Sequence, residues 1–290
     1  MTPFYKKSSY MSGFPLSSVE VDNFIDVAFE EDIASGDITC DLVIDKNSAL
    51  NASMNARENL VVAGLPIVEK IFLKLDPDSL ITMHAKDGDQ LSKGQDILSV
   101  SGKASALLSA ERTALNILQH LSGIATLTRQ YVTAIEGTQS KLLDTRKTIP
   151  GLRKLAKYAV HMGGGSNHRM GLYDAVMIKD NHIAVAGSVE AAITAAKSTG
   201  RDDIQVECDT LEQVKQALDA GANSLLLDNM SPGVITKALS IVAGTICCEA
   251  SGGVTLDTIR SIAETGVDYI SVGRLTQSAP AVDIGLDYID

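Results

Sequence analysis

The chain has 290 residues, 45% hydrophobic and 21% charged, which is the balance of an ordinary globular protein with a large core. A net charge of −11 argues against general attraction to nucleic acid or to an anionic membrane, and no apolar run is long enough to span a bilayer. The four cysteines form no CxxC pair and indicate neither a zinc site nor a disulfide framework. Because the N-terminus has no apolar core for a signal peptide, we expect a cytoplasmic protein.

The first half of the chain mixes helical and strand signals. Residues 1–35 indicate a helix, with apolar residues at helical spacing over 19–29. Residues 36–108 carry strand and turn signals, and the stretch GDQLSKGQDILSVSG resembles the hairpins of lipoyl-type sandwich domains. That stretch has no exposed Met-Lys acceptor, so we expect no swinging arm. A long helix is expected over residues 113–135.

The second half alternates short apolar runs with amphipathic segments. The runs predict strands at 142–143, 175–178, 204–206, 224–227, 245–248 and 269–272. The segments between the later runs predict helices at 188–199, 211–220, 232–243 and 256–265, each followed by a glycine. Repeated strand and helix units indicate a parallel sheet, and the absence of a Gly-rich dinucleotide turn favours a TIM-type barrel over a doubly wound sheet.

Polar, charged or glycine residues follow every predicted barrel strand, where a barrel enzyme carries its active site. The early strand ends and the loop near them supply cations, namely Arg146, Lys147, His168, Arg169 and Lys179. The middle strand ends supply two carboxylates, Glu207 and Asp228. The late strand ends supply a possible phosphate site, formed by Ser251, Gly252, Gly253 and Gly273.

This division suits a substrate pair with carboxylates, a sugar phosphate and a metal-bound pyrophosphate. Eight Lys or Arg and three acids lie between Lys141 and His182, which is a basic island in an acidic chain. Cations bind carboxylate and phosphate groups, while carboxylates can stabilise an oxocarbenium-like transition state. Glycosyl transfer from phosphoribosyl pyrophosphate fits these requirements.

Some residues of the basic island have plainer interpretations. Arg153, Lys154 and Lys157 fit an anion pocket or a solvated helix face equally well. Asp144 is expected to orient Arg146, and His120 and His161 are expected to be structural. His182 could support the site from behind, and the two residues before it, 180 and 181, could cap the next helix.

Seven blocks of the sequence resemble quinolinate phosphoribosyltransferases, in that family's order and over residues 19–290. The longest and most specific block is DTRKTIPGLRKLAKYAVHMGGGSNHRMGLYDAVMIKDNHI. The others are EEDIASGDIT, ERTALNILQHLSGIAT, VECDTLEQ, LLLDNMSP, EASGGVTLDTI and GVDYISVGRLTQSAP.

The resemblance implies a role for each site residue. Arg112 would bind quinolinate in the neighbouring subunit of a homodimer, and Arg146, His168, Arg169 and Lys179 would hold the carboxylates in their own chain. Lys147, Glu207 and Asp228 would contact phosphoribosyl pyrophosphate and its Mg²⁺, with the metal bound indirectly through that substrate. The 5-phosphate would bind at 251–253 and 273. We place Thr148 among the substrate-binding residues, and we name Lys147, Lys179, Glu207 and Asp228 as catalytic.

The implied fold is an N-terminal α/β sandwich over 1–117 and an incomplete α/β barrel over 118–277, with the tail 278–290 returning to the sandwich. Two positions depart from the commonest pattern. Cys40 stands where a hydroxyl residue is frequent, and Gln277 stands where a basic residue often lies in the phosphate loop.

Three other functions remain open from the residues alone. Lys179 could form a Schiff base in a barrel lyase. A related phosphoribosyltransferase could act on another aromatic acid, such as nicotinate. A non-catalytic phosphosugar sensor would bind the same groups without turnover.

Overall fold

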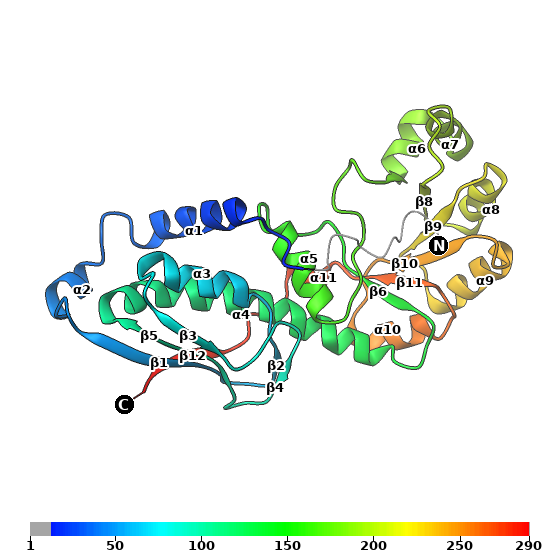
Figure 1. Cartoon of the computed structure of the whole chain (residues 1–290). Coiled ribbons are helices and arrows are strands. Elements are labelled where there is room, and N and C mark those ends of the chain that lie inside the picture. The colour runs from blue at the N-terminus through cyan, green and yellow to red at the C-terminus, as the bar shows by residue number, and fades with distance from the viewer. Residues whose placement is uncertain (1–12, 290) are drawn as a thin grey trace. The chain divides into compact units, whose positions relative to one another are not determined.

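The computed structural model describes residues 13–289, which fold into two compact units (Figure 1). The N-terminal unit contains residues 13–128, 154–164 and 278–289, and the barrel unit contains 129–153 and 165–277. The border between them falls within the long helix α4 (Ala104–Ala134). This border is defined by packing, and it differs from the predicted domain border between residues 117 and 118. The predicted domain limits stay a prediction. The first 12 residues of the predicted N-terminal helix lie outside the described residues.

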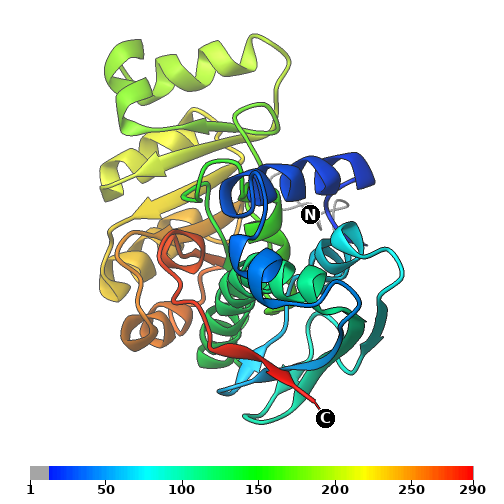
Figure 2. The same cartoon turned by 90° about the vertical axis from the view of Figure 1, so that its left-hand side faces the viewer.

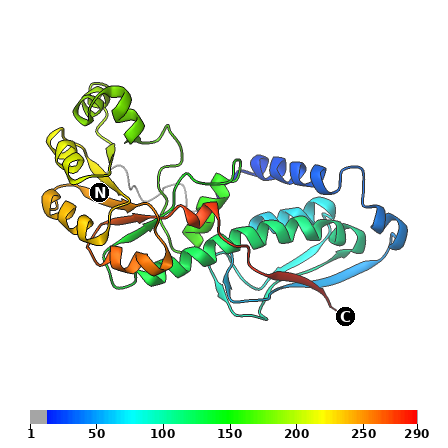
Figure 3. The same cartoon turned by 180° about the vertical axis from the view of Figure 1, so that it is seen from behind.

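The N-terminal unit is built on a four-stranded antiparallel sheet in the order β12-β1-β5-β3. Its strands are β1 (Ala49–Ala56), β3 (Leu80–Met83), β5 (Asp96–Lys103) and β12 (Ile284–Tyr288), and a second ladder joins β2 (Leu60–Val61) to β4 (Gln90–Leu91). Met54 pairs with Leu98 in register, and both are fully buried. α3 (Leu65–Leu75) and α4 lie over one face of this sheet (Figures 1 and 3).

The helices of this unit were only partly predicted. α1 (Ser18–Asp32) is the expected N-terminal helix, and Ser17 and Glu20 close its start as a capping box. α2 (Ile38–Val43) and α3 correct the expectation of strands and turns alone over residues 36–108. The start of α3 is held by Asp87, which accepts hydrogen bonds from the backbone N–H groups of Gly64 and Leu65. Because this helix cap comes from a residue far along the chain, the sequence near the start of α3 carries no capping signal.

The barrel unit contains six parallel strands in the order β6-β11-β10-β9-β8-β7. These are β6 (Lys141–Leu143), β7 (Val176–Ile178), β8 (Ile204–Cys208), β9 (Ser224–Asp228), β10 (Cys247–Ser251) and β11 (Tyr269–Ser271). β6 and β7 form opposite edges, and an isolated bridge from Leu143 to Ser166 extends the β6 edge. The barrel is therefore incomplete, and the predicted fold class is confirmed.

Helices follow the strands of the barrel unit in turn. They are α5 (Arg153–Met162, shared with the N-terminal unit), α6 (Asp180–Ala186), α7 (Val189–Lys197), α8 (Leu211–Asp219), α9 (Pro232–Val242), α10 (Leu256–Ala263) and α11 (Arg274–Gln277). Figure 2 shows α7 to α10 stacked along the sheet in chain order, from green to orange. The four predicted helices are α7 to α10, and each ends within two residues of its predicted limit.

One strand differs from its prediction in a way that affects the site. The expected run was 245–248, but β10 spans Cys247–Ser251. Glu249 therefore lies inside the strand and is fully buried, although we expected it in the polar segment after the strand. Among residues 13–289, no helix combines the length and the low polarity needed to cross a lipid bilayer.

Candidate active site at the carboxyl ends of the barrel strands

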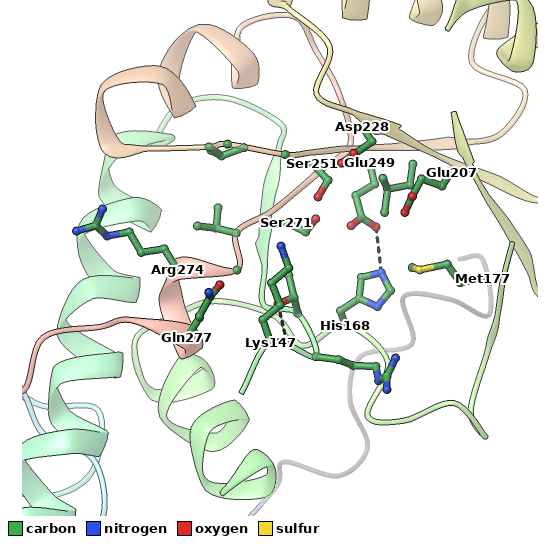
Figure 4. Close-up of a pocket in the computed structure, with 18 of the residues that line it drawn as sticks. Lys147, His168, Met177, Glu207, Asp228, Glu249, Ser251, Ser271, Arg274 and Gln277 are labelled. Carbon is green, nitrogen blue, oxygen red and sulfur yellow. Dashed lines mark hydrogen bonds and ion pairs between the residues drawn. The ribbon is translucent and has the colours of Figure 1, made fainter. Parts of the chain in front are cut away.

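A cavity of about 570 Å³ opens at the carboxyl ends of the barrel strands (Figure 4). Eleven of the predicted site residues line it, namely Arg146, Lys147, His168, Arg169, Lys179, Glu207, Asp228, Ser251, Gly252, Gly253 and Gly273. The structure therefore gathers one cavity from segments separated by more than 100 residues. Arg112 is exposed on α4 and does not line this cavity, and neither does Thr148.

Two guanidinium groups, of Arg146 and Arg169, share the cavity at close range. Burial and then the charge of Arg146 lower the pKa of Arg169 from its usual value. The Nη1 atom of Arg169 donates to the carbonyl oxygen of Ala175 over 2.8 Å, which fixes its guanidinium. The Nε atom of Arg146 is buried and finds no hydrogen-bond partner among the described residues. An anion between these groups would relieve both the repulsion and the unpaired donor.

The loop after β6 is tied down by Arg153, which does not line the cavity. Its Nε atom donates to Thr148 Oγ1 over 3.1 Å, and its Nη1 atom donates to the Met170 carbonyl over 3.0 Å. Thr148 thus faces Arg153, and its predicted contact with substrate stays a prediction. The sequence also left two interpretations for Lys154 and Lys157, an anion pocket or a solvated helix face. Lys154 is exposed and paired with Glu20, whereas Lys157 is fully buried.

Asp144 anchors the segment that carries His168 and Arg169. The side chain of Asp144 is buried, and it accepts one hydrogen bond from Asn167 Nδ2 at 2.6 Å and another from the His168 backbone N–H at 2.9 Å. The expected orientation of Arg146 by Asp144 stays a prediction, because these contacts concern the 167–168 segment.

Two carboxylates stand on the neighbouring strands β8 and β9. Glu207 is buried and forms an ion pair with Lys179. Asp228 is half-buried and accepts a hydrogen bond from Asn229 Nδ2 at 2.6 Å. Burial and then the charge of Asp209 raise the pKa of Asp228, although Lys179 and Lys147 act in the opposite direction. In this pair, the charge of Glu207 is neutralised by Lys179. The charge of Asp228 is only partly compensated by the lysines around it.

The glycine loop after β10 depends on close backbone approach. Gly252 has a φ of +92°, and a Cβ added there would lie 2.3 Å from Asn229 Oδ1 and 2.7 Å from the Asn229 backbone nitrogen. At Gly273 an added Cβ would lie 2.9 Å from Lys147 Cδ, so the lysine chain runs directly over this glycine. Arg274 and Gln277 complete the wall beside them. Gln277 stands where the commonest pattern has a basic residue. Arg274 therefore supplies a positive charge near that position.

Glu249 is the main residue for which the sequence predicted no role. Its Oε2 atom lies 3.2 Å from His168 Nε2, and it accepts a hydrogen bond from Gln205 Nε2 at 2.9 Å. Burial alone would raise the pKa of Glu249, but His168 beside it and hydrogen bonds from His168, Ser271 and Gln205 outweigh burial and lower it. A glutamate within an apolar strand run was the signal that could have identified it.

The remaining histidines of the prediction lie outside the cavity lining. His182 Nδ1 accepts the backbone N–H of Lys179 at 2.9 Å, so it contacts a site residue from behind. Asp180 and Asn181 begin α6 as its first two residues and are exposed, while the N-cap position is Lys179. His161 is exposed, and burial lowers the pKa of His120 on α4.

Comparison with known proteins gives a consistent result over most of the chain. The family models described as quinolinate phosphoribosyl transferase match the chain with the N-terminal domain at residues 37–122 and the C-terminal domain at 124–287. A probable nicotinate-nucleotide pyrophosphorylase (carboxylating) of Bacillus subtilis is 43% identical over 274 residues, covering 94% of this chain and 94% of the relative. The Mycobacterium leprae nicotinate-nucleotide pyrophosphorylase (carboxylating) is 43% identical over 270 residues, covering 90% and 94%.

Solved structures agree with the sequence relatives. The nicotinate-nucleotide pyrophosphorylase of Ehrlichia chaffeensis has a TM-score of 0.90 at 43% identity, covering 94% of this chain and 99% of that chain. The Francisella tularensis nicotinate-nucleotide pyrophosphorylase has a TM-score of 0.90 at 40% identity, covering 94% and 98%.

Proposed function

The chain belongs to the quinolinate phosphoribosyltransferase family, and from this premise we propose that it makes nicotinate mononucleotide in NAD biosynthesis. It transfers the phosphoribosyl group of phosphoribosyl pyrophosphate to quinolinate, with loss of CO₂ and pyrophosphate. The observation that carries this conclusion is the pair of close guanidinium groups, Arg146 and Arg169, in a cavity that also holds two carboxylates and a glycine loop.

The reaction needs two bond exchanges. The lone pair of the pyridine nitrogen forms a bond to the anomeric carbon of ribose, and the bond from that carbon to pyrophosphate breaks. The ring nitrogen then carries positive charge beside the 2-carboxylate. The bond to that carboxylate breaks with release of CO₂, its electron pair stays on ring carbon 2, and that carbon takes up a proton from solvent. The cationic ring is its own electron sink, so we propose no cofactor other than Mg²⁺.

The cations on the early strands bind the acid substrate. Quinolinate carries carboxylates at ring positions 2 and 3, and a guanidinium pairs with a carboxylate through two parallel hydrogen bonds. Arg146 has a buried donor that lacks a protein partner, and Arg169 is held in place by Ala175. Lys179 adds a third cation just after the carboxyl end of β7.

The middle and late strands bind phosphoribosyl pyrophosphate. Positive charge develops on the ribose ring as pyrophosphate leaves, and a nearby anion stabilises that charge. Asp228 is the better candidate for this role because Glu207 is paired with Lys179. The backbone N–H groups of 251–253 and 273, together with Arg274, would hold the 5-phosphate. Lys147 crosses Gly273 toward the same region.

The donor set suits a Mg²⁺ ion that enters with its substrate. Among the described residues no group of three or more His, Cys, Asp or Glu could hold a metal ion by itself. Glu207 and Asp228 would therefore hold the ion indirectly, through phosphoribosyl pyrophosphate, whose oxygens are the hard ligands that Mg²⁺ prefers. When bound, the ion would neutralise charge on the leaving pyrophosphate.

We further propose a homodimer in which Arg112 completes the neighbour's site. The exposure of Arg112 on α4, away from the cavity lining of its own chain, supports this. A cytoplasmic location is supported by Cys40, Cys208 and Cys248, which are free thiols in the structure and suit a reducing compartment.

A direct assay tests the proposed function. Purified protein incubated with quinolinate, phosphoribosyl pyrophosphate and Mg²⁺ should release nicotinate mononucleotide, CO₂ and pyrophosphate in equal amounts, without ATP. Nicotinate lacks the 2-carboxylate, so its kcat/KM should be lower by a factor of about thirty to several thousand, equivalent to about 2–5 kcal/mol. If nicotinate is used as well as quinolinate, or if turnover requires ATP, a nicotinate-type transferase takes the place of this assignment.

The Schiff-base lyase is disfavoured by the surroundings of Lys179. An amine nucleophile must be free to attack a carbonyl carbon, but the Nζ atom of Lys179 is engaged in an ion pair with the buried Glu207. Borohydride reduction in the presence of a carbonyl substrate should therefore leave Lys179 unmodified.

A further inference from the structure

Asn229 is a second residue to which the sequence assigned no role, although it contacts two parts of the cavity wall. It directly follows β9, is exposed and does not line the cavity itself. Its Nδ2 atom donates to Asp228 Oδ2 over 2.6 Å, and its backbone N–H donates to the carbonyl oxygen of Ser251 over 2.8 Å. Asn229 therefore joins the end of β9 to the end of β10.

The backbone of Asn229 lies in the left-handed region, with a φ of +53°. Among residues with a Cβ, asparagine is one of the few that adopt this conformation readily. In this conformation the side chain lies back over the two strand ends, where Asp228 stands opposite Ser251 in the parallel register (Figure 4). The residue type at 229 thus suits both the turn and the contact.

The amide group of Asn229 lies between the Asp228 carboxylate and the glycine loop. A Cβ added at Gly252 would lie 2.3 Å from Asn229 Oδ1 and 2.5 Å from its Cγ atom. An ionised carboxylate only accepts hydrogen bonds, so the amide turns its nitrogen to Asp228 and rests its oxygen against Gly252. A glycine at 252 is therefore needed for the amide as well as for the backbone of Asn229.

Only one oxygen of Asp228 is used by this contact. Oδ2 accepts the bond from Asn229, whereas Oδ1 accepts no hydrogen bond from any donor within residues 13–289. The amide therefore fixes the rotation of the carboxylate and leaves Oδ1 for a ligand in the cavity. Such support matters because a group that acts on a transition state loses much of its effect on rate when it is misplaced by about 1 Å.

We propose that Asn229 is a positioning residue, whose amide holds the Asp228 carboxylate beside the glycine loop. The anion that faces the anomeric carbon and the donors that bind the 5-phosphate then keep a fixed spacing, and one ribose phosphate spans the two adjacent strand ends. This inference rests on the proposed function for the identity of the ligand. The contact between the two side chains is a property of the protein without substrate.

The contact is measured on the unaltered protein. Side-chain amides are recorded by NMR with ¹⁵N-labelled asparagine, and the signals of Asn229 are assigned by their loss in Asn229→Gly. We expect the carboxylate to shift one of the two amide protons downfield, and Asp228→Ala should abolish this shift. The same position of that proton in the unaltered protein and in Asp228→Ala would overturn the proposal.

Kinetics test the effect on catalysis. Asn229→Gly keeps the left-handed backbone and removes only the amide, so we expect kcat to fall about tenfold, the effect of one hydrogen bond to a charged group. KM for quinolinate should change less than about twofold. Asn229→Ala removes the same amide but strains the backbone, so its Tm should be about 2–4 °C below that of Asn229→Gly at an equal kcat. A kcat that follows Tm in these two variants would contradict the proposal.

The effect must also pass through Asp228. The double variant Asp228→Ala with Asn229→Gly should be no slower than Asp228→Ala alone, and losses that multiply would mean that Asn229 acts independently. Asn223→Gly is the matched control and should keep a normal kcat, because Asn223 lies at the opposite end of β9, where its Oδ1 atom accepts the backbone N–H of Ile204 at 3.2 Å. If the unaltered protein makes no nicotinate mononucleotide, the proposed function fails, but the NMR measurement still decides the contact.

Discussion

Arg146 and Arg169 bring two guanidinium groups into one cavity. Each is half-buried, and their mutual repulsion is offset only in part by the charge of Asp174. The sequence predicted both residues, because charged side chains after apolar strand runs are conspicuous. It could not predict that Glu249 belongs to the site, because its contact with His168 spans 81 residues and only the folded sheet creates it.

At this scale we predict that Arg169→Ala lowers kcat/KM for quinolinate by a factor of about tens to thousands, the cost of removing one partner of a desolvated charge pair. Arg169→Lys keeps the charge but loses the planar fork, so it should recover only part of the loss. Steady-state kinetics of both variants check this. Arg201→Ala is the control, because that exposed arginine pairs with Asp203 at the surface, where ion pairs contribute little. Near-normal activity of Arg169→Ala would contradict the assigned clamp.

At the scale of elements, the barrel was predictable because each strand and helix carries its own local signal. Apolar runs marked the six strands, and glycines marked the ends of α7 to α10. The helices α2 and α3 were missed, and for α3 the cap comes from Asp87, 22 residues away from Leu65. The start of β10 was placed two residues early, since Thr245 and Ile246 are as suited to a strand as the residues that follow.

The glycine loop offers the prediction for this scale. Gly252→Ala and Gly253→Ala both force a side chain into positive φ, which should lower the free energy of unfolding by about 1–2 kcal/mol in each. Only the Cβ at 252 would also collide with the backbone of Asn229, and an added Cβ at 253 meets nothing within 4 Å. We therefore expect KM for phosphoribosyl pyrophosphate to rise about tenfold or more in Gly252→Ala alone. Equal kinetic effects in the two variants would show that strain, and not the collision, governs this loop.

At the scale of the whole molecule, each unit completes its own sheet from distant parts of the chain. β12 from the C-terminal tail pairs with β1 in the N-terminal unit, with Met54 opposite Leu286. The barrel unit supplies the whole lining of the cavity. The proposed dimer adds Arg112 from a second chain, and sequence similarity alone suggested that residue because no local pattern distinguishes one exposed helical arginine from another.

Subunit mixing tests this last proposal. Arg112→Ala and Lys179→Ala should each be inactive alone. After exchange of subunits, some heterodimer sites would contain neither lesion, and we expect up to about one quarter of normal activity, since random pairing makes half of the dimers mixed and each mixed dimer has one intact site. Absence of recovery, with exchange verified by mass spectrometry of differently tagged chains, would mean that Arg112 acts within its own chain.

The paired guanidinium groups and the glycine loop have a practical consequence for work at the bench. If they bind the substrates as proposed, both also accept small oxyanions when the substrates are absent, because neither distinguishes a substrate carboxylate or phosphate from a buffer ion by charge alone. Inorganic phosphate and sulfate should compete with both substrates, so rates measured in phosphate buffer would understate the enzyme. Titration of either salt at constant ionic strength, against chloride, separates occupation of the cavity from general screening.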